Sequence, residues 1–239
     1  MRIEASEPVR SAAPEMVGLR DGGEVETAVD REKQAAASAA VDVVEDGMLV
    51  GLGTGSTVGF LLPPLARRKL DITCVATSAA TRERAEALGL RMVPFTGIAA
   101  LDVAIDGADQ VDPGYWLVKG GGGAHTREKI VAAAAARFVV IVSSNKLVPR
   151  LSPPVPLELM RFGLDTVLAA LPEAVLRAAP PTPDGGVLAD FFGEVGSPEP
   201  LADKLMSVPG VVSHGLFPPS MVSFVVVGRG DSAEVLTPT

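Results

Sequence analysis

The strongest constraint on the fold is an alternation of short, continuously apolar runs with helical segments between residues 30 and 146. Strands that are apolar along their whole length belong to parallel sheets that helices cover on both faces. The sequence therefore predicts an α/β fold with a Rossmann-like parallel sheet. The expected strands are MLVGL, DITCVAT, RMVPF, LDVAID, YWLVK and FVVIVS, and the first helix is expected to begin after an N-cap at Asp30.

The alternation stops after Lys146, where residues 147–156 contain four prolines. Shorter strand-like and helical runs follow, which predicts a smaller α+β domain over residues 151–210, inserted into a Rossmann-like domain formed by residues 29–150 and 211–239. Residues 1–28 mix charge, proline and glycine without periodicity, and we expect a disordered extension there.

Composition narrows the partners of the chain. The formal net charge of −8 argues against a nucleic acid or an anionic membrane as partner. No apolar run is long enough to span a bilayer. The single cysteine, Cys74, can form no internal disulfide, which favours the reducing cytoplasm. We therefore expect a cytoplasmic protein whose anionic ligand, if any, is held by a local site.

A first candidate site is the glycine-rich segment GLGTGST, residues 51–57, between a predicted strand and a helix. Free amides at such a turn bind anions. The spacing is not G-x-G-x-x-G, no carboxylate ends the second strand, and the turn has no P-loop lysine, so a small phosphorylated metabolite fits better than a dinucleotide or a nucleoside triphosphate. A tight turn without a ligand remains an alternative. The expected phosphate-binding residues are Thr54, Gly55, Ser56 and Thr57, with Lys33 as counter-charge.

A second candidate site spans residues 101–129, LDVAIDGADQVDPGYWLVKGGGGAHTREK. Asp106 and Asp109 follow a predicted strand at the edge where α/β sheets bind ligands, and Lys119 ends the next strand. The glycines that follow expose backbone amides. Glu128 lies near a helix start, where it is either a base or an ordinary first-turn carboxylate. A carboxylate base beside a lysine is suited to moving a proton next to a carbonyl.

Metal and nucleophile chemistry find no support in the residue pattern. His125 and His214 are the only histidines, and no Cys/His metal spacing or G-x-S-x-G motif occurs. We therefore predict acid/base chemistry on a phosphosugar without a metal or another cofactor.

Taken together, GTGST, DGAD, KGGGGA…REKI and SSNK resemble the A-type ribose-5-phosphate isomerase family, in order and spacing, over roughly residues 30 to 230. The resemblance implies interconversion of ribose 5-phosphate and ribulose 5-phosphate through an enediolate, in the pentose phosphate pathway. It makes Glu128 the base that shuttles the proton. By the same resemblance, Asp106, Asp109 and Lys119 would open the ring, hold hydroxyls and stabilise the oxyanion; Gly120, Gly121 and Gly122 would pack against the sugar; and Lys33, Thr54, Gly55, Ser56, Thr57 and Lys146 would hold the phosphate.

The sequence departs from the family pattern at Gln110, His125 and Ser143. We expect His125 either to face solvent at the helix start or to face the pocket and alter the protonation of Glu128. Two other functions stay open: a sugar-phosphate sensor without turnover, and a phosphosugar isomerase of different specificity. Because members of the family are commonly dimers or tetramers, the resemblance also implies a homodimer or homotetramer.

Overall fold

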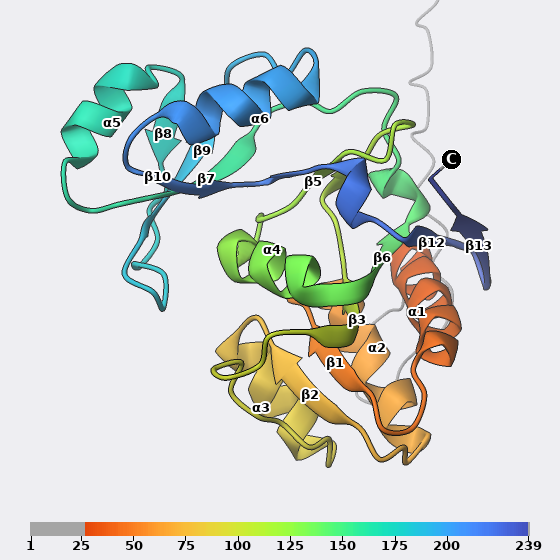
Figure 1. Cartoon of the computed structure of the whole chain (residues 1–239). Coiled ribbons are helices and arrows are strands. Elements are labelled where there is room, and N and C mark those ends of the chain that lie inside the picture. The colour runs from red at the N-terminus through yellow and green to blue at the C-terminus, as the bar shows by residue number, and fades with distance from the viewer. Residues whose placement is uncertain (1–26, 239) are drawn as a thin grey trace, which may run out of the picture.

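A computed structural model describes residues 27–238, and its central feature is a six-stranded sheet with the order β13-β12-β6-β3-β1-β2 (Figure 1). All neighbouring strands in it are parallel except the antiparallel pair β12–β13. This confirms the predicted parallel sheet. The strands are β1 (Leu49–Leu52), β2 (Thr73–Ala76), β3 (Leu101–Asp106), β6 (Ala135–Ser143), β12 (Phe224–Arg229) and β13 (Ser232–Leu236).

Helices cover both faces of this sheet, as its continuously apolar strands require. On one face, α1 (Ala28–Ala40), α2 (Ser56–Arg67) and α3 (Ala79–Ala87) contribute to one apolar core, with the short 3₁₀ helix η1 (Val41–Val43) beside them. On the other face, α4 (His125–Ala134) packs Val131 and Ala132 against the sheet in a second core. Strands β2, β3, β6 and β12 therefore bury side chains in both cores, whereas β13 at the edge has no buried residue.

A second, antiparallel sheet lies beyond α4, with the order β10-β7-β9-β8 (Figure 1). A third apolar core joins this small sheet to its own two helices, α5 (Leu164–Ala170) and α6 (Pro198–Ser207). Pro198 occupies the first turn of α6, directly after the N-cap Ser197. The strands are β7 (Val155–Leu159), β8 (Ala174–Leu176), β9 (Val187–Phe191) and β10 (Val211–His214).

The return of the chain from the small sheet differs from the expected boundary at residue 211. Residues 211–239 were expected in the larger domain, but β10 pairs with β7, with Val211 opposite Leu159 and His214 opposite Leu157. Next, β11 (Leu216–Phe217) joins β5 (Leu117–Val118) and β4 (Gln110–Val111) in a three-stranded sheet. Only after η3 (Pro219–Met221) does the chain re-enter the large sheet at β12. Alternating residues identify a strand but not its partner, which explains the difference.

Four local expectations also need correction. Thr27 is the N-cap of α1, accepting a hydrogen bond from the amide of Asp30 at 3.1 Å, so Thr27 and Ala28 belong to the fold and Asp30 lies in the first turn. The rest of the expected extension, residues 1–26, lies outside the described residues. The expected strand RMVPF is reduced to a single bridge between Met92 and Cys74, while YWLVK keeps only Leu117–Val118 as strand and lies outside the large sheet.

None of the helices between residues 27 and 238 combines the length and the apolar character that a membrane crossing requires.

Candidate active site

The site lies where the strand order of the large sheet reverses. From β1 the chain moves outward to β2 and then returns to β3 on the opposite side of β1. Connections that leave in opposite directions open a crevice at the carboxyl ends of the two central strands, which is where doubly wound sheets bind ligands. Here that crevice receives the GTGST turn from β1 and Asp106 from β3, and the Gly53 amide donates to the carbonyl of Ile105 at 3.0 Å.

A cavity of about 300 Å³ occupies this crevice and gathers the two sequence motifs. All of the predicted site residues line it except Asp106, which lies beneath the cavity with 3% of its surface exposed. Asn145, which no sequence pattern singled out, also lines the cavity. The predicted residues on the cavity wall are Lys33, Thr54, Gly55, Ser56, Thr57, Asp109, Lys119, Gly120, Gly121, Gly122, Glu128 and Lys146.

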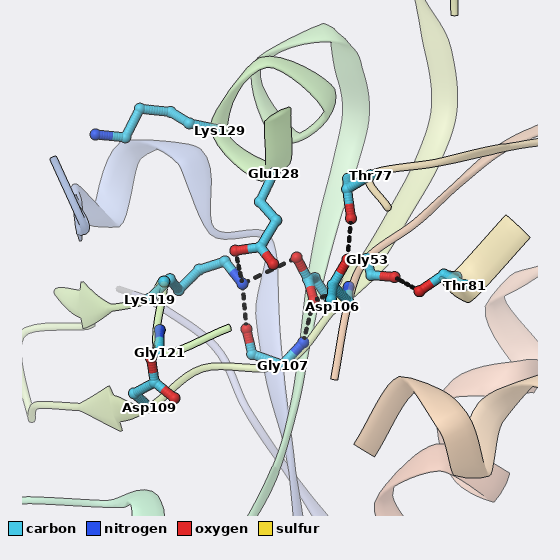
Figure 2. Close-up of polar contacts among 12 residues, drawn as sticks. Gly53, Thr77, Thr81, Asp106, Gly107, Asp109, Lys119, Gly121, Glu128 and Lys129 are labelled. Atoms are coloured by element: carbon cyan, nitrogen blue, oxygen red, sulfur yellow. Dashed lines mark hydrogen bonds and ion pairs between the residues drawn. The ribbon is translucent and has the colours of Figure 1, made fainter. Parts of the chain in front are cut away.

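Lys119 is the centre of the buried polar cluster (Figure 2). Its ammonium nitrogen lies 2.9 Å from Oδ2 of Asp106 and 3.1 Å from Oε2 of Glu128, and it donates to the carbonyl of Gly107 at 2.5 Å. All three charged side chains are at most 5% exposed. One buried cation is therefore shared by two carboxylates that come from β3 and α4.

This crowding sets the protonation of Glu128. Burial, followed by the neighbouring charge of Asp106, raises the pKa of Glu128 to about 7, although Lys119 opposes the shift. Burial alone would lower the pKa of Lys119, but Asp106 and Glu128 raise it above its ordinary value, so the lysine stays charged. A carboxylate whose pKa lies near neutrality can accept a proton from a bound molecule. The neighbouring ammonium can then stabilise the negative charge that develops on the molecule that lost the proton.

Asp106 is held in place by backbone amides that follow β1 and β3. Its Oδ1 accepts hydrogen bonds from the amide of Thr54 at 3.1 Å and from that of Gly107 at 2.7 Å. A Cβ at Gly53 would lie 1.9 Å from the carboxyl carbon of Asp106, so only glycine fits there. Gly53 therefore does more than allow the anion-binding turn. Because it has no side chain, it also leaves room for the Asp106 carboxylate, which holds Lys119.

The glycine run after Lys119 folds as a tight loop against the small sheet and α4. Gly120 has φ +105°, a backbone conformation that favours glycine, and a Cβ there would lie 2.7 Å from the His125 ring. The next amide, that of Gly121, donates to Oδ2 of Asp109 at 2.8 Å. The loop therefore connects Lys119 to Asp109, both of which line the cavity.

The end of the cavity that is suited to a phosphate is formed by the start of α2. Gly55 precedes the helix at φ 118°, and Ser56 and Thr57 follow in its first turn, where backbone amides have no partner within the helix. The predicted cations Lys33, on α1, and Lys146, in the 3₁₀ helix η2 (Ser144–Lys146), reach the same cavity. Helix amides together with two ammonium groups suit a phosphate.

Two threonines that the sequence analysis did not select support this turn from behind (Figure 2). Thr77 Oγ1 lies 2.7 Å from Thr54 Oγ1, and Thr81 Oγ1 donates to the carbonyl of Gly53 at 2.8 Å. Both threonines follow β2. For the end of this strand, the sequence pattern indicated only that a carboxylate is missing.

The three departures from the family pattern leave the predicted residues in place. His125 is fully buried behind Gly120, so the expectation of a solvent-facing ring is wrong, and the ring does not line the cavity either. Burial lowers the pKa of His125 to about 4, which keeps the ring neutral. Gln110 lies outside the cavity and pairs with the backbone of Ser152. Ser143 donates to Oδ1 of Asn145 at 2.6 Å and so acts on the cavity wall only through Asn145.

Within residues 27–238, no cluster of three or more histidine, cysteine, aspartate or glutamate side chains is arranged to hold a metal ion.

Comparison with known proteins gives one consistent result. The family model for ribose 5-phosphate isomerase A (phosphoriboisomerase A) matches residues 73–232. The chain is 42% identical to ribose-5-phosphate isomerase A of Sphingopyxis alaskensis, over 85% of this chain and 95% of that protein. It is also 42% identical to the Methanosarcina acetivorans protein of the same name, over 84% of this chain and 92% of that one.

Solved structures agree with these sequence matches. The crystal structure of ribose 5-phosphate isomerase A from Neisseria gonorrhoeae superposes with a TM-score of 0.82 at 32% identity, covering 88% of this chain and 97% of that one. A D-ribose-5-phosphate isomerase in complex with phospho-erythronic acid gives the same TM-score and identity, covering 87% and 99%. The similarity therefore extends over nearly the whole of these two structures.

Proposed function

This chain belongs to the ribose 5-phosphate isomerase A family, and we propose that it carries out the isomerisation with Glu128 as the base that moves the proton. As an aldose–ketose isomerase of this family it acts on a phosphosugar, with ribose 5-phosphate and ribulose 5-phosphate as the interconverting pair. The supporting observation is the placement of Glu128 and Lys119, 3.1 Å apart and buried, at the wall of the same cavity as the anion turn.

The substrate is held at its two ends. We assign its phosphate to the amides and hydroxyls of residues 54–57, with Lys33 and Lys146 supplying positive charge. The aldehyde end then lies toward Lys119 and Glu128, while the glycine loop and Asp109 border the hydroxyl-bearing carbons. This orientation places the substrate phosphate beside the positive groups of the cavity. These local groups attract the phosphate, whereas the net negative charge of the whole protein would repel it.

The chemical step moves one proton between neighbouring carbons. The carboxylate of Glu128 removes the proton on C2 of the open-chain aldose, and the electrons of the broken C–H bond form the C1–C2 double bond while O1 becomes negative. The Lys119 ammonium stabilises this enediolate oxygen. A proton passes from O2 to O1, the C2 carbonyl forms, and Glu128 returns its proton to C1. No atom is gained or lost, and Glu128 ends as it began.

Asp106 has a supporting part in this proposal. We assign it no direct contact with the sugar, since it is not among the residues that line the cavity. It holds Lys119 in place through the 2.9 Å ion pair, and its charge raises the pKa of Glu128. The ring-opening and hydroxyl-binding roles therefore fall to Asp109 and Lys119, which do line the cavity.

The test is turnover of ribose 5-phosphate by the parent, by Glu128→Gln and by the control Glu86→Gln, which changes an exposed glutamate on α3. We expect the parent and the control to form the ketose at equal rates. Loss of a general base lowers the rate by roughly 10²- to 10⁴-fold, and this is the loss expected for Glu128→Gln. A parent that binds the sugar phosphate without converting it would instead support the sensor, an alternative that the family comparison does not favour.

We further propose that the protein is a homodimer or homotetramer in the cytoplasm. A groove of about 870 Å³ on the other side of α4 is lined by Ile130, Met160, Phe162 and Val212, all exposed apolar side chains, with Phe162 89% exposed. Apolar surface of this kind is typical of subunit contacts. Light scattering after size exclusion counts the subunits: a monomeric mass would refute the oligomer. Cell fractionation tests the cytoplasmic location.

A further inference from the structure

The peptide group between Gly120 and Gly121 is held at both of its polar ends. Its N–H, on Gly121, donates to Oδ2 of Asp109 at 2.8 Å. Its carbonyl oxygen, on Gly120, accepts from Nη1 of Arg177 at 2.9 Å, and the same Nη1 lies 3.3 Å from the carbonyl of Gly121. Because a trans peptide is planar, fixing both ends fixes the orientation of the whole group.

Arg177 is itself rigidly held by the small sheet. It follows β8, and its backbone amide donates to the carbonyl of Leu188 at 2.9 Å. Its guanidinium forms a two-pronged pair with Asp190 on β9, with Nε–Oδ2 at 2.8 Å and Nη2–Oδ1 at 2.6 Å. Both side chains are more than four-fifths buried, so solvent competes little for these bonds. Two-pronged arginine–carboxylate pairs fix geometry as well as charge.

The glycines make such a restraint necessary. With glycine on both sides, the peptide between residues 120 and 121 meets no Cβ that would oppose its rotation, and Gly120 already has φ +105°. A rotated peptide would turn its carbonyl oxygen toward the carboxylate of Asp109 and release its hydrogen bond. Lys119, the residue directly before Gly120, carries the ammonium that pairs with Glu128.

We propose that Arg177, oriented by Asp190, is a positioning residue for the isomerisation: it locks the Gly120–Gly121 peptide and thereby the placement of Asp109 and Lys119. This gives the small sheet a function in the reaction, since it supplies the clamp for a loop at the carboxyl edge of the large sheet. Arg177 acts through the loop, because it is not among the residues that line the cavity. The proposal rests on the isomerase activity assigned above.

The experiment compares kcat and KM for ribose 5-phosphate in the parent, Arg177→Ala, Arg177→Lys and Asp190→Asn. The control is Arg82→Met, which breaks an exposed arginine–glutamate pair on α3 whose Nε–Oε1 distance is 2.9 Å. A small misplacement of catalytic groups costs up to roughly 100-fold in rate, so we expect kcat of Arg177→Ala to fall roughly 10- to 100-fold with KM changed by less than about threefold. Arg177→Lys cannot make the two-pronged contact and should lose rate too, Asp190→Asn should lose less, and the control should match the parent.

Rescue separates positioning from damage to the fold. Millimolar ethylguanidinium, which restores a guanidinium to the space left by Arg177→Ala, is expected to raise kcat of this variant and leave the parent unchanged. A parent-like kcat in both Arg177→Ala and Arg177→Lys would overturn the proposal. So would a loss of kcat in Arg177→Ala that ethylguanidinium does not relieve. If Arg177→Ala fails to fold, Arg177→Lys and Asp190→Asn decide it by their kcat. A parent without turnover would refute the assigned activity instead, so the two failures are distinguishable.

Discussion

Replacing Glu128 by glutamine tests how strongly the site disfavours its own base. In the folded protein the charged form of Glu128 is destabilised by burial and by Asp106, which raises its pKa from 4.5 to about 7. Glu128→Gln removes the charge and keeps the size of the side chain. We expect the variant to become progressively more stable than the parent as pH rises, although it loses the catalytic base.

The sign and size follow from proton binding. Between pH 4.5 and about pH 7 the folded state keeps the Glu128 proton and the unfolded state has released it, so the stability of the parent falls as pH rises through this window. A pKa shift of one unit corresponds to about 1.4 kcal/mol, so the full shift corresponds to about 3 kcal/mol. Glutamine does not titrate. The packing difference between protonated glutamate and glutamine is the same at both ends of the window and cancels.

The assay is urea unfolding of parent and variant at about pH 5 and about pH 8, with the difference in free energy of unfolding compared between the two conditions. Because pH 5 already lies above the unfolded pKa of 4.5, we expect the difference to grow by about 2–3 kcal/mol in favour of Glu128→Gln at the higher pH. The control Glu86→Gln, on the exposed face of α3, should change by less than about 0.5 kcal/mol. A Glu128→Gln difference that stays constant with pH would refute the claim that the site raises the pKa of its base.

Three further outcomes are expected. The kcat/KM of the parent should fall as pH drops below about 7, because Glu128 must be ionised to accept the proton, and a flat pH–rate profile down to pH 4.5 would exclude it as the base. Gly53→Ala should lower both turnover and stability, the latter by roughly 1–3 kcal/mol, since its Cβ would lie 1.9 Å from the carboxyl carbon of Asp106. Ketose formation and thermal melting measure the two effects. A variant that matches the parent in both would show that Asp106 does not pack this closely against Gly53. Gln110→Ala should lower the free energy of unfolding by about 1 kcal/mol, because it breaks the hydrogen bonds to Ser152. It should leave kcat unchanged, since Gln110 lies outside the cavity. A tenfold fall in kcat would give this departure from the family a catalytic role.

The convergence of the two motifs could be predicted from the sequence because it depends only on strand ends. Asp106 ends one apolar run and the GTGST turn follows another, and the carboxyl ends of parallel strands share one edge of a sheet. That rule placed the turn, Asp106 and Asp109 together without knowledge of loop geometry. It reached Lys119 only by treating YWLVK as a strand of the same sheet, whereas β5 belongs to the three-stranded antiparallel sheet. It could not show that Asp106 lies below the cavity, because this depth is set by the amides of Thr54 and Gly107.

What the sequence could not predict depends on how the small sheet covers α4. His125 reads as an ordinary helix-start residue, but the loop at Gly120 buries it completely. Arg177 and Asp190 lie 13 positions apart, and only the pairing of β8 with β9 brings them together. Pairing partners depend on register, and register is not visible in an alternating pattern alone. The same limit misplaced β10 in the larger domain.

In the proposed reaction, Glu128 carries the proton between C2 and C1. The most direct measurement is the rate at which the sugar exchanges carbon-bound hydrogen with D₂O during isomerisation, followed by NMR in the parent, Glu128→Gln and Glu86→Gln. We expect deuterium to enter C1 of ribulose 5-phosphate in the parent and the control, and Glu128→Gln to lose exchange and turnover by the same factor, roughly 10²-fold or more. A correctly folded Glu128→Gln that exchanges at the parent's rate would show that Glu128 does not carry the proton.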